Sequence, residues 1–297
     1  MTMPVRLLLH PNLGLMPSIW HNKILSLLIG TPWQNRRGYP DDYNDDLLMK
    51  MQTYVINLDR SADRWQRIHH NLSDLGVAHQ RVDAIDAQAH SLDDSGYNAT
   101  RNMAEYFLPL KNAEVACYMS HLKALKQFLA DPSVEYGLVL EDDVELLEAS
   151  QGMESIANWL GCKKAGVVKL YSKRHVFGSQ VGHLSNATIL KPWRIPLGFQ
   201  AQLWNRLAAQ EFVNKCASFY QPIDVEFQFN WRYDFSVYLV DKNKVRELSA
   251  QVGGSTISPS KNKLGFAKLR LEVARPWFRF KLLFKVLSYM LTVYRGR

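Results

Sequence analysis

The chain has 297 residues, of which 47% are hydrophobic and 22% are charged. This length allows one large or two small domains with an ample core, and the composition excludes a disordered chain. The three cysteines, Cys117, Cys162 and Cys216, are widely spaced and form no metal-ligand motif, which favours a reducing compartment. No hydrophobic run reaches the roughly 18 residues that a membrane-spanning helix needs.

The net charge of +8 is concentrated at the C-terminal end. Residues 261–297 contain ten Lys or Arg and one acid, Glu272, so they carry +9 and the other residues sum to −1. The main part of the chain therefore gives no indication of nucleic-acid binding.

Residues 1–50 differ in character from the residues that follow. Short apolar pieces are interrupted by prolines, and an acidic stretch, 41–46, precedes the first clear strand. We expect a non-native or disordered extension, with the natural start at Met49 or Met51.

Strands and helices are expected to alternate from residue 52 onwards. Strands are predicted at 52–58, 77–82, 138–140, 166–171, 200–203 and 235–240, and helices at 62–75, 112–130, 150–160 and 207–216. Residues 87–111 read as an irregular loop, and residues 172–197 carry turn signals. The alternation predicts an α/β fold, with a parallel or mixed sheet and helices on both faces.

Three consecutive acids, Glu141, Asp142 and Asp143, follow the apolar run 138–140. The run is typical of a buried strand, and ligands of open α/β sheets bind at the carboxyl ends of strands. Adjacent carboxylates repel one another, and Mg²⁺ or Mn²⁺ with oxygen ligands is their natural compensation. Because side chains alternate in extended chain, Glu141 and Asp143 would share a site while Asp142 points elsewhere. A solvated acidic turn is the alternative.

Three further residues are candidates for the functional site. His121 lies beside the apolar stripe of the helix 112–130, either as a structural histidine or as a site residue. Asp224 and Glu226 follow Pro222, which fixes the local chain. Each of these acids is either a candidate site residue or a helix cap or salt-bridge partner.

Four segments in this order resemble bacterial glycosyltransferase family 25, the lipopolysaccharide and lipooligosaccharide β-galactosyltransferase-like proteins. They are Tyr54-Val55-Ile56-Asn57-Leu58-Asp59-Arg60 with Arg64, Val82-Asp83-Ala84-Ile85-Asp86, Glu114-Val115-Ala116-Cys117-Tyr118-Met119-Ser120-His121, and residues 138–144. Later echoes are Val168-Lys169-Leu170, Pro222-Ile223-Asp224 and Gly254-Ser255-Thr256-Ile257.

The resemblance implies a GT-A-like, Rossmann-type mixed sheet and an inverting, metal-dependent transfer of a hexose, usually galactose, from a UDP-sugar. Glu141, Asp142 and Asp143 would then form the metal-binding motif for Mn²⁺ or Mg²⁺. Asp224 would be the base that deprotonates the acceptor, with Glu226 in reserve. The candidate nucleotide-sugar contacts are Asn57, Arg64, Asp83, Asp86 and His121.

One segment departs from the family. Where the family tends to read Gly-Thr-His-Ala-Tyr, this chain has Gly198-Phe199-Gln200-Ala201-Gln202. That segment is expected to line the sugar or acceptor pocket, so the donor sugar is left open.

The C-terminal segment 261–297 interleaves aromatic and aliphatic residues with Lys and Arg. This pattern is typical of a basic amphipathic segment on anionic lipid, and a basic helix packed on the domain is the alternative. We therefore expect three regions: the extension 1–50, a glycosyltransferase domain 51–260 and a membrane-associating tail 261–297.

These features favour an enzyme that extends a lipid-linked oligosaccharide at the cytoplasmic face of the bacterial inner membrane. The rival is a catalytically inactive, membrane-associated binder of nucleotide or sugar, and a metallohydrolase is a distant third. The intact acidic cluster favours the enzyme.

Overall fold

The computed structural model describes residues 50–89, 91–93, 95–249 and 266–295. Two predictions lie outside the described residues. They are residues 1–49 of the extension predicted at 1–50, and the family resemblance at Gly254-Ser255-Thr256-Ile257. The domain boundaries therefore stay predictions.

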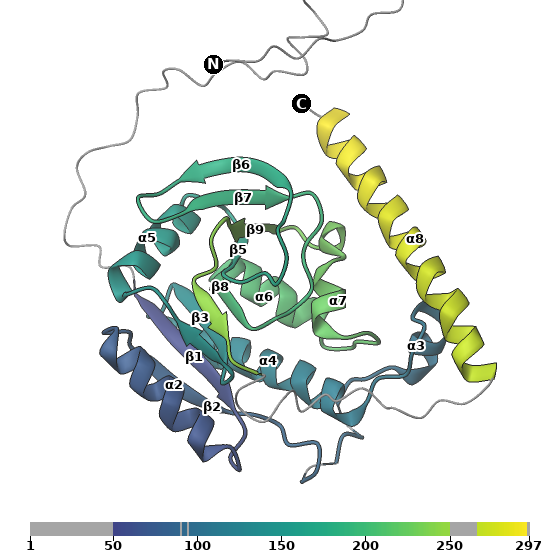
Figure 1. Ribbon diagram of the computed structural model, residues 1–297, viewed down its shortest axis with the longest axis horizontal. Coiled ribbons are helices and arrows are strands. Elements are labelled where there is room, and N and C mark those ends of the chain that lie inside the picture. Colours follow the sequence, from purple (N-terminus) through teal and green to yellow (C-terminus); the bar gives the residue numbers. More distant parts are fainter. Residues whose placement is uncertain (1–49, 90, 94, 250–265, 296–297) are drawn as a thin grey trace, which may run out of the picture. The chain divides into compact units, whose positions relative to one another are not determined.

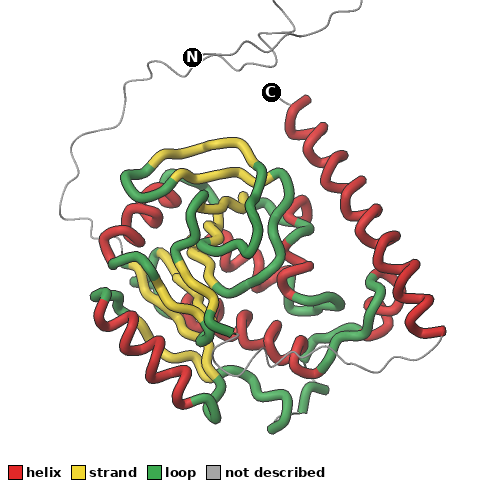
Figure 2. Tube along the Cα trace, viewed as in Figure 1, coloured by secondary structure: helices red, strands yellow, loops and turns green. Residues whose placement is uncertain are grey.

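A mixed eight-stranded sheet forms the centre of the described part of the chain (Figures 1 and 2). Its strands lie in the order β2-β1-β3-β8-β5-β9-β7-β6. The bounds are β1 Met51–Asn57, β2 His79–Asp83, β3 Tyr136–Glu141, β5 Gly166–Lys169, β6 Gly178–His183, β7 Thr188–Pro192, β8 Ala201–Asn205 and β9 Ser236–Val240. A small second sheet pairs β4 (Val144–Leu146) with β10 (Val245–Glu247). The expected α/β class and mixed sheet are confirmed.

Helices cover both faces of the sheet, and side chains of alternate strand residues pack on opposite faces. Their bounds are α2 Ala62–Asp74, α3 Ala99–Glu105, α4 Asn112–Ala130, α5 Ser150–Gly161, α6 Arg206–Lys215, α7 Ile223–Phe227 and α8 Phe266–Arg295, with a 3₁₀ turn, η1, at Asn230–Arg232. In β1, Tyr54 and Ile56 pack with α4 and α6, whereas Val55 packs with α2 and α5. The two cores explain why the central strands are almost wholly apolar.

The predicted β-α-β unit is present. β1 and β2 are parallel neighbours joined by α2, which ends before Gly76 in the left-handed region at φ 67°. β1 also pairs in parallel with β3, so Asn57, Asp83 and Glu141 end neighbouring strands at one edge of the sheet. This edge is where the site is built.

One loop prediction was wrong, because residues 87–111 contain α3. Residues 172–197, for which only turn signals were noted, contain the β6–β7 hairpin. β6 is largely exposed and rich in glycine and polar residues, so it lacks the hydrophobic alternation by which a strand is recognised.

β8 runs antiparallel to both of its neighbours, β3 and β5. Its first residue, Ala201, is therefore at the same edge as the last residues of β3 and β5, Glu141 and Lys169. The segment that precedes β8 is thus delivered to the site.

The C-terminal end of α4 is capped by a side chain from another helix. The guanidinium of Arg206, at the start of α6, donates to the carbonyl oxygens of Leu129 (2.7 Å), Asp131 (2.7 Å) and Val134 (2.8 Å). These bonds satisfy carbonyls that no later helical turn can reach, and they join α4 to α6.

We expect Arg206→Ala to lower the free energy of unfolding by about 1–3 kcal/mol, because carbonyls at a partly buried helix end lose their donors. Urea denaturation followed by circular dichroism measures this. Arg206→Lys keeps the charge but not the planar fork, so it should recover only part of the loss. A stability equal to that of wild type in Arg206→Ala would contradict the capping role.

Candidate functional site

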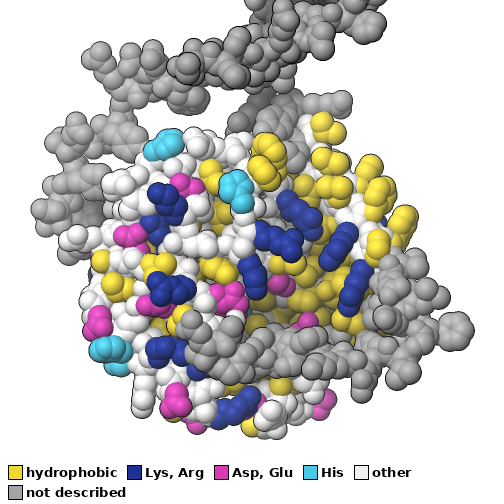
Figure 3. Space-filling model, viewed as in Figure 1, with side chains coloured by type: hydrophobic (Ala, Val, Ile, Leu, Met, Phe, Trp, Pro, Cys, Tyr) yellow, Lys and Arg dark blue, Asp and Glu magenta, His cyan; other side chains and the backbone are white. Residues whose placement is uncertain are grey.

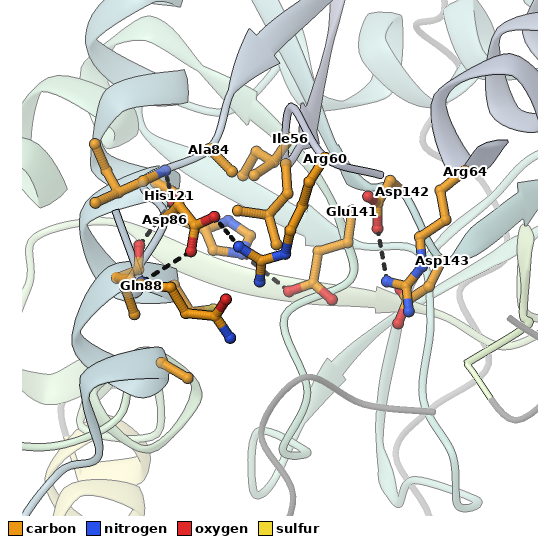
Figure 4. A pocket seen from close by; sticks show the side chains of 17 residues that line it. Ile56, Arg60, Arg64, Ala84, Asp86, Gln88, His121, Glu141, Asp142 and Asp143 are labelled. Atoms are coloured by element: carbon orange, nitrogen blue, oxygen red, sulfur yellow. Dashed lines mark hydrogen bonds and ion pairs between the residues drawn. The ribbon is translucent and has the colours of Figure 1, made fainter. Parts of the chain in front are cut away.

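A cavity of about 210 Å³ lies at the carboxyl ends of β1, β2 and β3, beside α4. Strand ends and the residues just after them contribute Ile56, Ala84, Asp86 and Glu141, and α4 contributes His121 (Figure 4). Cys117 of α4 also lines the cavity. The site thus forms where parallel strands end against a helix, as the position of the acids predicts.

Asp142 is engaged by protein groups. Its carboxylate accepts from Asn57 Nδ2 at 2.7 Å and from Arg64 at 3.2 Å, and its backbone oxygen accepts from Arg67 at 3.0 Å. Asn57 is 1% exposed and also donates to the Ser61 carbonyl. The negative charge of Asp142 is therefore compensated by protein groups, and these bonds fix the turn after β3.

Within the described residues, neither Glu141 nor Asp143 forms a hydrogen bond or ion pair with an Arg or Lys side chain. Glu141 pairs with His121 Nε2 at 3.0 Å, and Asp143 Oδ1 is buried without a hydrogen-bond partner in the described part of the chain. Burial raises the pKa of Glu141 to about 8 and that of Asp143 to about 7, and repulsion between the neighbouring acids adds to both shifts. Asp142 lines the same cavity as these two acids, and residues 142–143 form a turn, so the expectation that Asp142 points elsewhere is wrong.

His121 cannot supply a positive charge that would compensate Glu141 and Asp143. Burial lowers its pKa to about 3, so the imidazole is neutral at physiological pH. The two carboxyls therefore lie in a setting that a divalent cation would stabilise, and a buried unpartnered oxygen and two hard carboxylates fit Mn²⁺ or Mg²⁺.

Cys117 is a site residue that the sequence analysis did not recognise. Its sulfur, a nitrogen of His121 and a carboxylate oxygen of Glu141 lie within 4.8 Å of one another, so these three groups could also hold a metal ion. Burial raises the pKa of the Cys117 thiol well above its usual value, and the negative charges of nearby acids raise it further. The four-residue spacing of Cys117 and His121, which puts both on one helix face, was the available signal.

The other predicted nucleotide contacts have different positions. Arg64 and Asp86 line the cavity, and Asp86 forms an ion pair with Arg60, which also lines it (Figure 4). Asp83 does not line the cavity; its side chain is exposed beside Arg81, and its carbonyl accepts from Lys123 at 2.7 Å. Their roles as ligand contacts stay predictions.

Asp224 and Glu226 lie on the same short helix, α7, in different surroundings. Asp224 is half-buried, and its carboxylate accepts from the Gly198 amide at 3.1 Å. Its charge acts on Glu141, His121 and Lys169, so it belongs to the surroundings of the acidic cluster.

Glu226 takes part in a separate buried network. Its carboxylate accepts from Gln221 at 2.5 Å, Arg232 at 3.1 Å and Tyr233 at 2.9 Å, and the residue is 6% exposed. These contacts correspond to the salt-bridge alternative for this acid, and it does not line the cavity.

The segment that departs from the family lies at the start of β8. Gly198 has φ 93°, a conformation that favours glycine, and Phe199 packs edge-on against His121 at 4.9 Å. Gln202 is fully buried within the sheet, and neither amide atom has a partner in the residues that the structure covers. It does not line the cavity.

The solved structures to which this chain is similar match it at low sequence identity and low TM-score. A 4-diphosphocytidyl-2C-methyl-D-erythritol synthase from Anaerococcus prevotii is 12% identical at a TM-score of 0.36, over 68% of this chain and 94% of that one. A glycosyltransferase involved in glycosylating the major capsid of PBCV-1 is 10% identical at 0.34, over 63% and 81%. A Drosophila β-1,4-galactosyltransferase 7 variant in complex with manganese, UDP-Gal and xylobiose is 10% identical at 0.34, over 74% and 79%. No curated protein matches the chain in sequence.

The family comparison is more specific. The model of glycosyltransferase family 25, described as an LPS biosynthesis protein, matches residues 50–183. This range contains every described residue that lines the cavity. Residues 50–183 of this chain are therefore similar to glycosyltransferase family 25.

Proposed function

We propose that this chain is an inverting transferase that moves a hexose from a UDP-sugar to an oligosaccharide of lipopolysaccharide or lipooligosaccharide. Galactose is the first candidate for the hexose. The observation that carries the proposal is a pair of half-buried acids, Glu141 at the end of β3 and Asp143 just after it, that line the cavity of the family-matched segment.

Glu141 and Asp143 are the proposed ligands of Mn²⁺ or Mg²⁺, and Asp142, which lines the same cavity, is held by Asn57 and Arg64. A divalent ion would neutralise charge that develops on the departing UDP. Arg60 and Arg64, which line the same cavity, are suited to binding diphosphate oxygens.

Asp224 is the proposed base. The bond between the sugar C1 and the UDP oxygen breaks, the acceptor oxygen bonds to C1 from the opposite face, and the acceptor proton passes to Asp224. The hydrogen bond from the Gly198 amide orients this carboxylate. Glu226 is less suited to this role because both of its oxygens are engaged.

The membrane is the proposed second partner, through α8. One face of this helix packs on the domain: Phe278 contacts Tyr106, Phe107 and Phe229, and Leu282 and Val286 are buried. No helix in the described part of the chain is both long and apolar enough to cross a membrane.

The opposite side of α8 carries a second apolar face. Its exposed members follow three- and four-residue spacings, and they are Trp277, Phe280, Leu283, Phe284, Leu287 and Leu291. Exposed Arg275, Arg279, Lys281 and Lys285 accompany them, and Figure 3 shows hydrophobic and basic side chains side by side over this helix. A face of this kind, with cations beside it, suits the surface of an anionic bilayer.

A second copy of the chain is a poorer partner for this face. The described side chains of α8 include four exposed cations and no acid, so two such helices would repel each other. We therefore propose a peripheral position on the cytoplasmic face of the inner membrane, where a lipid-linked acceptor is accessible.

Metal binding can be tested without turnover. The raised pKa values of Glu141 and Asp143 mean that the metal-free folded protein holds protons that the unfolded chain releases. Its stability should therefore fall as pH rises from about 4.5 towards 8. Mn²⁺ should raise the Tm more at pH 8 than at pH 5, as measured by differential scanning fluorimetry.

Glu141→Gln combined with Asp143→Asn should abolish the Mn²⁺ shift. Glu135→Gln, at an exposed position before β3, is the matched control and should retain it. An equal Mn²⁺ shift in the double variant would contradict the assignment of these two acids.

The activity test follows UDP release from a panel of UDP-sugars, with truncated lipooligosaccharide as acceptor. Asp224→Asn should lower kcat about 100-fold or more with little change in donor KM, because the base acts only on the acceptor. Asp143→Ala should abolish metal-dependent release, whereas Glu135→Gln should behave as wild type. UDP binding without turnover on any donor and a competent acceptor would favour the inactive binder.

Membrane binding can be tested by sedimentation with vesicles. We expect the wild-type protein to bind vesicles that contain phosphatidylglycerol. The double variant Phe280→Ser, Phe284→Ser should bind them with about 10-fold lower affinity. Leu207→Ser, at an exposed apolar residue of α6, is the control and should bind as wild type. Equal binding of all three proteins would overturn the role of α8, and a dimer lost only in the double variant would instead assign this face to self-association.

A further inference from the structure

Lys169, at the end of β5, is a buried charge that the proposed mechanism has not used. It is 2% exposed, and its ammonium donates to the carbonyl oxygens of Pro196, at 3.0 Å, and Gly198. The rings of Phe199 and Phe227 lie 5.8 and 5.9 Å from its Nζ. A buried ammonium is costly, so a lysine kept at this position needs a reason.

Two acids of the site compensate this charge. Burial lowers the pKa of Lys169 to about 8, and the carboxylates of Asp224 and Glu141 act in the opposite direction. The ammonium is therefore electrostatically linked both to the proposed base and to a proposed metal ligand.

The backbone of Gly198 connects Lys169 to Asp224 directly. Its carbonyl accepts from the ammonium, and its amide donates to Asp224 Oδ2 at 3.1 Å. Gln228, which follows α7, adds a bond of 2.6 Å from its side-chain nitrogen to the Ile195 carbonyl. The segment 195–199 is thus held by β5 on one side and by α7 on the other.

The same segment also reaches the metal side of the site. Phe199 packs edge-on against His121, whose Nε2 contacts Glu141 at 3.0 Å. Displacement of the segment would therefore disturb the spacing between Asp224 and Glu141.

We propose that Lys169 is a positioning residue, which holds the segment 195–199 so that Asp224 stays fixed relative to Glu141. The proposal rests on the proposed function for the role of Asp224 as base. It predicts that Lys169 affects sugar transfer to the acceptor and leaves donor binding intact.

The positioning itself can be measured without turnover, by hydrogen–deuterium exchange of the full chain. In Lys169→Met, the peptide that covers 195–200 should exchange about 10-fold faster, while β1 and β3 stay protected. Lys164→Met, at an exposed lysine next to β5, should exchange as wild type. Lys169→Gln, which keeps a donor but no charge, serves if the Met variant does not fold. Unchanged exchange at 195–200 in the variant that folds would overturn the proposal.

A kinetic double-mutant cycle tests whether Lys169 acts through Asp224. Alone, Lys169→Met should lower kcat about 100-fold with donor KM unchanged, but in an Asp224→Asn background it should add little. Full additivity of the two losses would refute the link. A wild-type chain that transfers no sugar would refute the proposed function, and the exchange experiment would still decide the role of Lys169.

Discussion

Repulsion among carboxylates is the constraint on which the site depends. Glu141, Asp142, Asp143 and Asp224 gather near one edge of the sheet, where partial burial makes unpaired negative charge costly. The protein compensates Asp142 with Asn57 and Arg64, and compensates Asp224 with the Gly198 amide and the nearby Lys169. Glu141 and Asp143 are left with raised pKa values, so the charge pattern itself separates the residues that support the site from those suited to a cation.

The mixed order of the sheet explains how these groups come together. Parallel strands β1, β2 and β3 contribute residues at their ends, whereas antiparallel β8 contributes the segment before its start. Insertion of β8 between β3 and β5 puts the segment 195–199 between Glu141 and Lys169. A wholly parallel sheet would place the beginning of that strand at the opposite edge.

Strong hydrophobic patterns were sufficient to predict much of the fold. The strands β1, β3, β8 and β9 and the helices α2, α4, α5 and α6 were predicted near their observed bounds. The strands are short, almost wholly buried runs, and the buried residues of the helices recur at helical spacing. The β6–β7 hairpin and α3 were missed because β6 and α3 are mostly exposed and show no hydrophobic periodicity.

The site could be predicted only in part. The three acids 141–143 were recognisable because they directly follow an apolar run. His121 was recognisable because it ends a segment, 114–121, that resembles the family. The exposure of Asp83, the ion-pair network around Glu226 and the burial of Lys169 depend on contacts between residues far apart in the chain. Spacing along one element carries no information on such contacts.

The two apolar faces of α8 have a practical consequence for handling the protein. In detergent-free solution, the outer face would promote aggregation as concentration rises. Removing the helix is no simple remedy, because Tyr106, Phe107 and Phe229 would lose the aromatic ring that covers them. Polar substitutions confined to the outer face are therefore the sounder route to a well-behaved sample, since they leave the packing against the domain untouched.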